Sequence, residues 1–197
     1  MLKKILIGGI GGGIIMFCWL GLAWSTWHMS QFKTIPEDRA VMGELALRNM
    51  DSGLYYYPGM PPDKTDAAAM EAWTETMNSG PTISMMAYQK GGSNPDNPFI
   101  YVRGAIYCIF GACLLSWMLA LAAPSLPKYF SRVLFCSAAG MLVAFSGPLL
   151  TGNFFQYPPM HSFFELFDQL VGWTMVGLLL ALVCRSGAAR AELKTAS

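Results

Sequence analysis

His161, Glu165 and Asp168 are the residues whose types and spacing could support chemistry in this chain. Positions i, i+4 and i+7 share one face of an α-helix, so a helix here would bring one imidazole and two carboxylates together. Ionisable side chains within an apolar segment are costly, and they mark sites such as proton relays or metal sites. His28 is the only other histidine, and two histidines with two carboxylates would make a plausible metal set.

A purely structural interpretation of these residues is the stronger alternative. They begin a long apolar stretch, where the positive end of the helix dipole favours carboxylates, which can stay in the hydrated headgroup layer. Pro158 and Pro159, just ahead, are typical of a helix start. Motifs for a serine-hydrolase elbow, a zinc protease, a phosphate loop or haem attachment are absent, so we expect neither an enzyme nor a cofactor. A lipid-acting enzyme that uses Glu165 and Asp168 as acid and base is a weaker alternative.

Four apolar stretches must position these residues. The chain has 197 residues, of which 54% are hydrophobic and 13% charged, whereas about a quarter are charged in a soluble domain. Each stretch is long enough to cross a bilayer core of about 30 Å, and together they comprise residues 5–27, 99–123, 129–151 and 163–184. The sequence therefore predicts an integral membrane α-helical protein with a bundle of four transmembrane helices.

Basic residues predict the orientation of this bundle. They precede the first stretch, lie between the second and third, and follow the fourth: Lys3, Lys4, Lys128, Arg132, Arg185, Arg190 and Lys194. Cytoplasmic flanks accumulate Lys and Arg, so both termini are expected in the cytoplasm, within a bacterial inner (plasma) membrane. Residues 28–98, with nine acids and five bases, are then extracytoplasmic. Arg103 and Arg132, each near an end of its apolar stretch, can snorkel to the headgroups. A cleaved signal peptide is the alternative for the first stretch, which is too long and lacks an Ala-x-Ala site.

The predicted domain organisation follows from these stretches. Residues 1–27 form transmembrane helix 1, residues 28–98 an extracytoplasmic α/β segment, residues 99–185 transmembrane helices 2 to 4, and residues 186–197 a cytoplasmic tail. The net charge of +1 disfavours nucleic acid as a partner. The five cysteines lie in or beside the apolar stretches, where we expect them to be small buried apolar residues.

The first stretch contains two overlapping pairs of glycines four residues apart, Gly8 with Gly12 and Gly9 with Gly13. Such pairs allow another helix backbone to approach closely. That helix could belong to this chain or to a partner, and the sequence favours neither. Glycine pairs seven residues apart predict similar packing faces on the second and third stretches (Gly104, Gly111, Gly140 and Gly147). An aromatic belt at the outer interface accounts for Trp19, Trp24, Trp27, Phe163, Phe164 and Phe167 among others.

The extracytoplasmic segment has the pattern of a small folded unit. We expect a helix between Pro36 and Asp51, a strand at 54–57, a second helix at 66–78 and a second strand at 82–89. This order allows a parallel β-α-β pairing. Four aromatic residues are candidates for its core or, less often, for a partner surface (Tyr55, Tyr56, Tyr57 and Trp73).

These observations predict a non-catalytic membrane protein, an accessory or assembly subunit of a larger complex. Residues 28–98 and the glycine-rich first helix would bind other membrane subunits or a second copy, and the bundle would contact membrane lipids. The alternative is an ion or metal handling protein that uses His161, Glu165 and Asp168 at the outer end of the fourth helix.

Overall fold

The structure is a computed structural model that describes residues 2–37, 39, 43 and 47–184. Within these ranges it has four helices long and apolar enough to cross a membrane, which are Leu2–Gln31, Pro98–Ser125, Tyr129–Phe154 and Pro159–Val183. They confirm the four predicted stretches, with bounds that differ by at most four residues. The first helix continues to Gln31, so His28 belongs to it, and the fourth begins at Pro159, so it includes His161.

Three of the four long helices are built from several elements. The first is α1 (Leu2–Ala23), the π-helical turn η1 (Trp24–His28) and the 3-10 turn η2 (Met29–Gln31). The second is α4 (Pro98–Ala122) with η3 (Ala123–Ser125), and the third is α5 (Tyr129–Ala144), η4 (Phe145–Leu149) and α6 (Leu150–Phe154). The fourth is α7 (Pro159–Val183).

Local sequence explains where these helices start and widen. The Asn97 side chain accepts a hydrogen bond from the Phe99 amide, and Pro98 fills the first helical position of α4, where no amide partner is needed. Pro148 lies inside η4 and has no N–H to donate, so the helix widens there into a π-turn.

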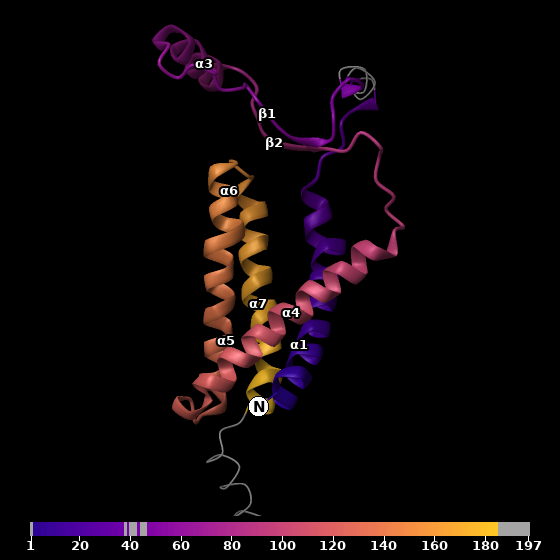
Figure 1. Cartoon of the computed structure of the whole chain (residues 1–197), viewed down its shortest axis with the longest axis vertical. Coiled ribbons are helices and arrows are strands. Elements are labelled where there is room, and N and C mark those ends of the chain that lie inside the picture. The colour runs from indigo at the N-terminus through magenta and orange to yellow at the C-terminus, as the bar shows by residue number, and fades with distance from the viewer. Residues whose placement is uncertain (1, 38, 40–42, 44–46, 185–197) are drawn as a thin grey trace, which may run out of the picture. The chain divides into compact units, whose positions relative to one another are not determined.

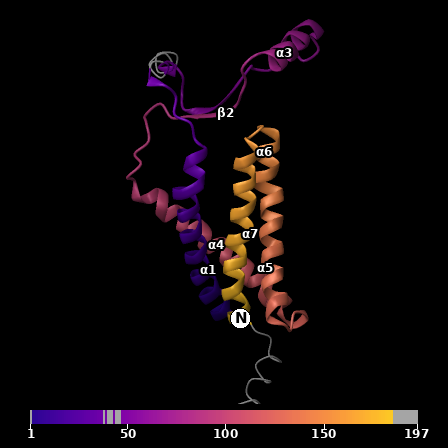
Figure 2. The same cartoon turned by 180° about the vertical axis from the view of Figure 1, so that it is seen from behind.

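The four helices pack as a bundle in which α1 contacts both α4 and α7, and α5 contacts α7. Figures 1 and 2 show α5 beside α7 and α4 crossing α1 obliquely. The start of α1, the α4–α5 connection and the end of α7 lie at the same end of the bundle. The buried core comes from α1, α4, α5 and α7 and includes Met16, Leu115, Leu119, Cys136, Val176 and Leu180.

The glycine face of α1 is occupied by this chain's own helices. A Cβ atom at Gly13 would lie 2.5 Å from the Ile109 Cα, and one at Gly9 would lie 2.9 Å from the Cys113 Cα. The backbones of α1 and α4 therefore touch along this face. The other two glycines lie against α7 as well as α4, since side chains of both helices come within 3.5 Å of the positions that their Cβ atoms would take (Gly8 and Gly12).

Arg132 contradicts the expectation that it snorkels to the headgroups. It lies in the first turn of α5 and is buried, and its guanidinium donates to the carbonyls of Leu126, Pro127 and Ala181 at 2.8, 2.8 and 3.1 Å. The carbonyls at a helix C-terminus carry partial negative charge and lack partners within the helix, so a cation is stabilised there. Arg132 thus joins the start of α5, the connection before it and the end of α7.

The cysteines differ in their burial. Cys136 and Cys184 are buried, as the expectation of small apolar residues requires. Cys108 and Cys113 are half-buried, and Cys18 is exposed on α1, so the expectation is wrong for Cys18. A cysteine is only weakly polar, and a side chain that faces lipid needs no burial by protein.

Residues 34–95 form a second compact unit. It contains β1 (Gly53–Tyr57), α3 (Ala67–Ser79) and β2 (Ile83–Tyr88), close to their predicted positions. The Asp66 side chain caps α3 by accepting from the amides of Ala68 and Ala69. The predicted helix between Pro36 and Asp51 falls partly outside the described residues.

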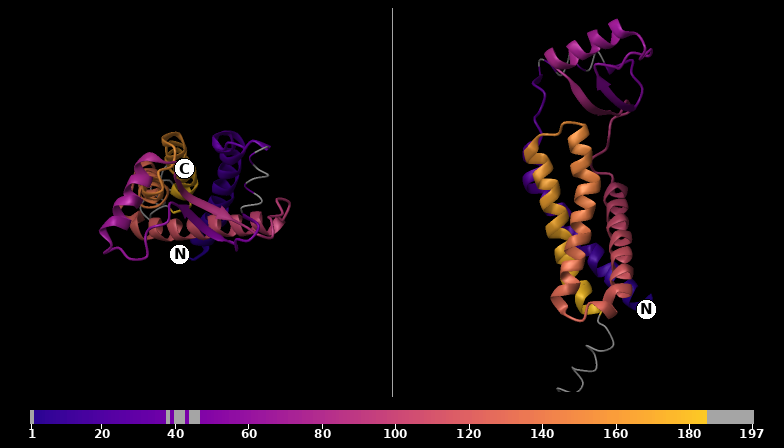
Figure 3. Two further views of the ribbon diagram at one scale, coloured as in Figure 1. Left: turned by 90° about the horizontal axis from the view of Figure 1, so that it is seen from above. Right: turned by 90° about the vertical axis from the view of Figure 1, so that its left-hand side faces the viewer.

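The expected parallel pairing of the two strands is wrong. β1 and β2 are antiparallel, with Gly53 opposite Tyr88 and Tyr57 opposite Ile83, and α3 lies in the connection between them (Figure 3). A parallel pair needs a crossover helix that covers a face of the sheet. α3 has no fully buried residue and covers no such face, so the chain returns beside β1 in the opposite direction.

Candidate functional site

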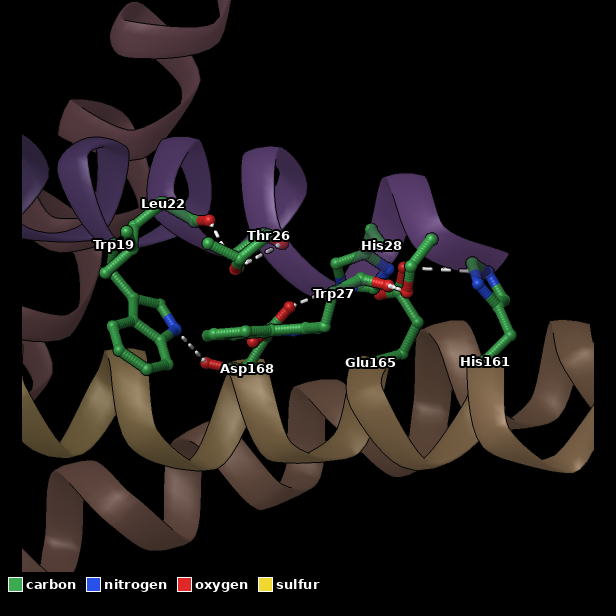
Figure 4. A network of polar contacts seen from close by, with 10 residues as sticks. Trp19, Leu22, Thr26, Trp27, His28, His161, Glu165 and Asp168 are labelled. Carbon is green, nitrogen blue, oxygen red and sulfur yellow. Dashed lines mark hydrogen bonds and ion pairs between the residues drawn. The ribbon is translucent and has the colours of Figure 1, made fainter. Parts of the chain in front are cut away.

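A buried histidine–aspartate pair joins the first and fourth helices. His28 is the last residue of η1, and Asp168 lies in the third turn of α7. The His28 Nε2 and the Asp168 Oδ2 are 2.5 Å apart, and both residues are almost fully buried (Figure 4). Charge-assisted hydrogen bonds of this kind are about twice as strong as neutral ones.

The local helix geometry explains why these two residues meet. The wider π-turn of η1 changes the face on which Trp27 and His28 project, and such turns are frequent at functional sites. On the other helix, a Cβ atom at Gly172 would lie 2.6 Å from the Met16 sulfur, so α1 and α7 are in close contact one turn beyond Asp168. The Trp19 indole also donates to the Asp168 backbone carbonyl at 3.2 Å.

Aromatic rings surround the pair. Trp24 stacks on the His28 ring at a centroid separation of 4.9 Å, and Phe164 meets the same ring edge-on at 6.2 Å. Trp27 packs against both Trp19 and Phe167, at centroid separations of 5.6 and 6.0 Å. These residues therefore exclude water from the pair, which strengthens every electrostatic interaction there.

Three polar atoms in this cluster are buried without a hydrogen-bond partner among the described residues: Trp27 Nε1, His28 Nδ1 and Asp168 Oδ1. An unsatisfied buried donor or acceptor costs about 1 to 3 kcal/mol. Most native proteins have only a few such atoms, so three beside one ion pair are unusual. Within the pair itself, the His28 Nδ1 is therefore open to bind a proton.

A second pair lies next to the first, nearer the start of α7. The His161 Nε2 is 3.8 Å from the Glu165 Oε1, one helical turn away on α7. The His161 ring is perpendicular to the His28 ring, with their centroids 5.5 Å apart, and it also contacts the Tyr157 ring at 5.4 Å. Figure 4 shows the two pairs following one another between the facing helices.

The structure thus brings together the four ionisable residues that the sequence singled out, but as two pairs. His161 and Glu165 remain partly exposed near the start of α7, as the structural interpretation expects. Asp168 does not, because its side chain is buried between α1 and α7 rather than placed in a headgroup layer. No group of three or more His, Cys, Asp or Glu residues in the described ranges could hold a metal ion.

Sequence reasoning did not assign the aromatic residues to this site. Trp19, Trp24, Trp27 and Phe164 were interpreted as an interfacial belt, whereas here they enclose the buried pair. One signal was available in the spacing of Trp24 and His28, since residues four apart on a helix are neighbours. The contacts across to α7 had no signal in the sequence.

The candidate partner residues in the second unit fall into two groups. Tyr56 and Tyr57 are more than half exposed, so the interpretation that they form a core is wrong for these two. Tyr55 and Trp73 are half-buried, and both hold the unit together, since the Tyr55 hydroxyl donates to the Asp51 carbonyl and the Trp73 indole donates to the Pro58 carbonyl.

Comparison of the chain with family models, with curated proteins and with solved structures finds no match in any of the three. Function must therefore be inferred from the geometry of the chain itself. Two features of that geometry bear on function: the His28–Asp168 pair with its neighbours, and the exposed aromatic strand of the second unit.

Proposed function

We propose that this protein is a non-catalytic inner-membrane protein, an accessory or assembly subunit whose residues 34–95 bind another protein. The observation that carries this proposal is the lack of a core in that unit. Of its described residues only Pro58 is buried. Large apolar side chains of the strands and of the loop after β1 are exposed instead (Leu54, Tyr56, Tyr57, Met60, Ile83 and Met85).

Such a unit needs a surface to pack against. An isolated two-stranded sheet is marginally stable in water, and three or more strands or a covering helix are needed for independent stability. In addition, β1 and β2 are both edge strands, with one row of backbone groups each outside the pair. Edge strands of this kind accept a further strand from a partner, with pockets for alternate side chains providing specificity.

The partner contact belongs to this unit rather than to the first helix. The four glycines of α1 already lie against α4 and α7, so they offer no free face to another subunit. The lipid-facing sides of the bundle remain apolar, as expected for a protein that contacts membrane lipids.

Charge distribution supports the orientation that this function requires. The two predicted cytoplasmic flanks within the described residues, at the start of α1 and between α4 and α5, lie at one end of the bundle. Both carry basic residues (Lys3, Lys4, Lys128 and Arg132). We therefore place both termini in the cytoplasm and residues 34–95 on the opposite side.

Site-specific crosslinking in native membranes tests the proposal. A photoreactive amino acid at Tyr56 should give one discrete protein adduct, whereas the same amino acid at Thr74, an exposed position on α3, should give none. Replacing Tyr56 and Tyr57 by Ser should weaken co-purification of the crosslinked protein about tenfold or more, because interface aromatics are common binding hot spots. Thr74→Ser is the matched control.

Two outcomes would overturn the proposal. Crosslinks from Tyr56 that reach only lipid, or only the bundle of the same molecule, would mean that the unit packs on its own membrane surroundings. Co-purification of that protein that is unaffected by the tyrosine replacements would mean that the exposed strand does not bind it. An adduct with a second copy of this chain would identify the partner as the protein itself.

The alternative, ion handling, is favoured by a different observation, the buried His28–Asp168 pair. Its geometry suits a proton better than a metal ion, because the four ionisable residues form two separate pairs and no metal-binding group of three is present among the described residues. The bundle core beyond Asp168 is apolar, including Met16, Val176 and Leu180, so a continuous pathway across the membrane is not favoured.

A further inference from the structure

We propose that His28 and Asp168 form a buried proton-binding site that exchanges protons with water through His161 and Glu165. The inference is independent of the proposed partner binding. It rests on four residues of α7 and the first helix and on the unpartnered Nδ1 of His28.

The four side chains form a gradient of exposure. Glu165 is 22% exposed and His161 16%, whereas His28 is 1% and Asp168 2% exposed. The two histidine rings, 5.5 Å apart between centroids, bring the partly exposed pair next to the buried pair. A proton from water can therefore reach Glu165 or His161 directly, and the adjoining His161 ring provides its route to His28.

The buried pair can hold one proton or two. With one proton, on the Nε2 of His28, the imidazole is neutral, the Asp168 carboxylate is charged, and the pair carries a net charge of −1 in an apolar, water-excluding environment. A second proton, bound at the Nδ1, makes an imidazolium–carboxylate pair with no net charge. Burial of an uncompensated charge is costly, so the surroundings favour the two-proton state.

The unpartnered atoms fit this exchange. The Nδ1 of His28 has no hydrogen-bond partner among the described residues, so it is open to receive a proton. His161 can deliver one by ring rotation: it takes a proton from Glu165 or water and releases it to His28, and its own ring returns to the neutral form. No bond other than N–H and O–H bonds forms or breaks, and no co-reactant is needed.

The charged and titratable groups that face the pair are few. On α7 they are Glu165 and His161, and from the turn before α7 the ring of Tyr157 contacts His161. The neighbours from the first helix and from η2 to Phe32 are uncharged, and they include Trp19, Trp24, Trp27 and Phe32. Proton uptake at the pair is therefore governed by Asp168 itself and by the charge of the His161–Glu165 pair.

Nuclear magnetic resonance of the full chain in lipid nanodiscs tests the proposal directly. The chain has two histidines, so a sample with ¹⁵N-labelled histidine rings gives two ring systems that His28→Gln and His161→Gln distinguish. The pH is varied from about 4 to about 9, which spans the titration of histidine and neighbouring carboxylates. We expect the number of protons on the His28 ring to change within this range.

Asp168→Asn is the informative variant, because it removes the countercharge and keeps the shape of the side chain. His28 should then bind its second proton at least about tenfold more weakly, as expected for the loss of a neighbouring opposite charge. Asp168→Glu, which keeps the carboxylate, should retain tight binding, and it also serves if the Asn variant does not fold.

The entry route has its own readout, the exchange rate of the His28 ring proton with water. His161→Phe should slow this exchange about tenfold or more, since it removes the group that carries the proton. Phe164→Leu changes the packing against the same His28 ring without removing a proton carrier, and it should leave the rate nearly unchanged.

A His28 ring that keeps one protonation state across the whole pH range would overturn the proton-binding site and leave a static structural pair. Equal effects of Asp168→Asn and Asp168→Glu on His28 would overturn the role of the Asp168 charge. Equal exchange rates in His161→Phe and Phe164→Leu would overturn the route through His161.

Discussion

At the scale of single residues, the His28–Asp168 pair combines a short hydrogen bond with the energetic cost of buried polar atoms. Its short hydrogen bond lies where water is excluded, yet three polar atoms around it lack partners among the described residues. Removing one partner of a buried ion pair is far more costly than replacing both by apolar groups, because the remaining group is left uncompensated.

A double-mutant cycle on this pair should show strong coupling. His28→Leu leaves the Asp168 carboxylate alone and should lower the free energy of unfolding by about 3 to 5 kcal/mol. Asp168→Leu leaves a neutral imidazole and should cost about 1 to 3 kcal/mol. The double variant should cost less than the sum by at least about 1 kcal/mol, measured by denaturant titration in detergent micelles. Additive losses would show that the two side chains do not depend on one another.

Asp63 provides a residue-scale prediction outside the bundle. The hydroxyl and amide of Thr65 donate to the Asp63 Oδ1 at 2.7 and 2.9 Å, and these bonds hold the pKa of the Asp63 carboxyl below its ordinary value. Because this pKa is lowered by folding, the turn gains stability above the ordinary carboxyl pKa and loses it as the pH falls through the lowered value.

Thr65→Val should raise the pKa of Asp63 towards that of a free aspartate, because it removes the hydroxyl donor, which has the largest effect. Carboxyl ¹³C resonances followed through an acid titration measure this pKa. Thr74→Val is the control, since the Thr74 hydroxyl donates within α3 to the Met70 carbonyl. An unchanged Asp63 titration in Thr65→Val would contradict the assignment.

At the scale of elements, close helix contacts at glycine determine the bundle. The backbones of α1 and α4 touch at Gly9 and Gly13, and Gly111 and Gly140 make room for the Trp173 side chain of α7. Gly147 has nothing within 4 Å of its would-be Cβ, so the predicted small face of the third helix is used at only one of its two glycines. Van der Waals packing of this type drives helix association where water provides no hydrophobic force.

Gly13→Ala and Gly21→Ala form a matched pair on one helix. An added Cβ at Gly13 would meet the Ile109 backbone at 2.5 Å, which cannot yield as a side chain can, whereas Gly21 has open space. Gly13→Ala should therefore lower the free energy of unfolding by about 1 to 3 kcal/mol through overpacking. Gly21→Ala should be neutral or stabilising, because Ala is the better helix former by about 1 kcal/mol. Equal stability of the two variants in a detergent unfolding titration would contradict the α1–α4 contact.

At the scale of the whole molecule, the four helices run in alternating directions, so the start of α1 and the end of α7 lie at the same end of the bundle. Residues 34–95 form a separate unit with little core. The bundle has its own buried core and glycine contacts, whereas the second unit depends on a few hydrogen bonds. We expect the second unit to become more stable when a partner covers its strands.

Reporter fusions test the orientation of the molecule. Alkaline phosphatase inserted after Gly59, an exposed loop position, should be active because this reporter folds outside the cytoplasm. A fluorescent protein fused after Ser197 should fluoresce in the cytoplasm. The positive-inside asymmetry predicts this result. An inactive phosphatase together with a dark C-terminal fusion would indicate the inverted orientation.

The sequence by itself determined the four apolar helices, because hydropathy and length are local properties of about 20 consecutive residues. It also located β1, α3 and β2, through turn residues and capping at Asp66, and it singled out His28, His161, Glu165 and Asp168. Local pattern cannot specify which surfaces meet, and for that reason strand direction, the neighbours of the α1 glycines and the role of Arg132 required the tertiary structure.

Only the tertiary structure decided that His28 pairs with Asp168. These residues are 140 positions apart in the chain, and their contact depends on the π-turn at η1 and on the close approach of α1 to α7 at Gly172. Neither feature has a local sequence signature, because each follows from how two helices pack. Burial then changes the chemistry of the pair: the same carboxylate that would be an ordinary surface acid in a headgroup layer is, between two helices, the centre of a proton-binding site that we propose.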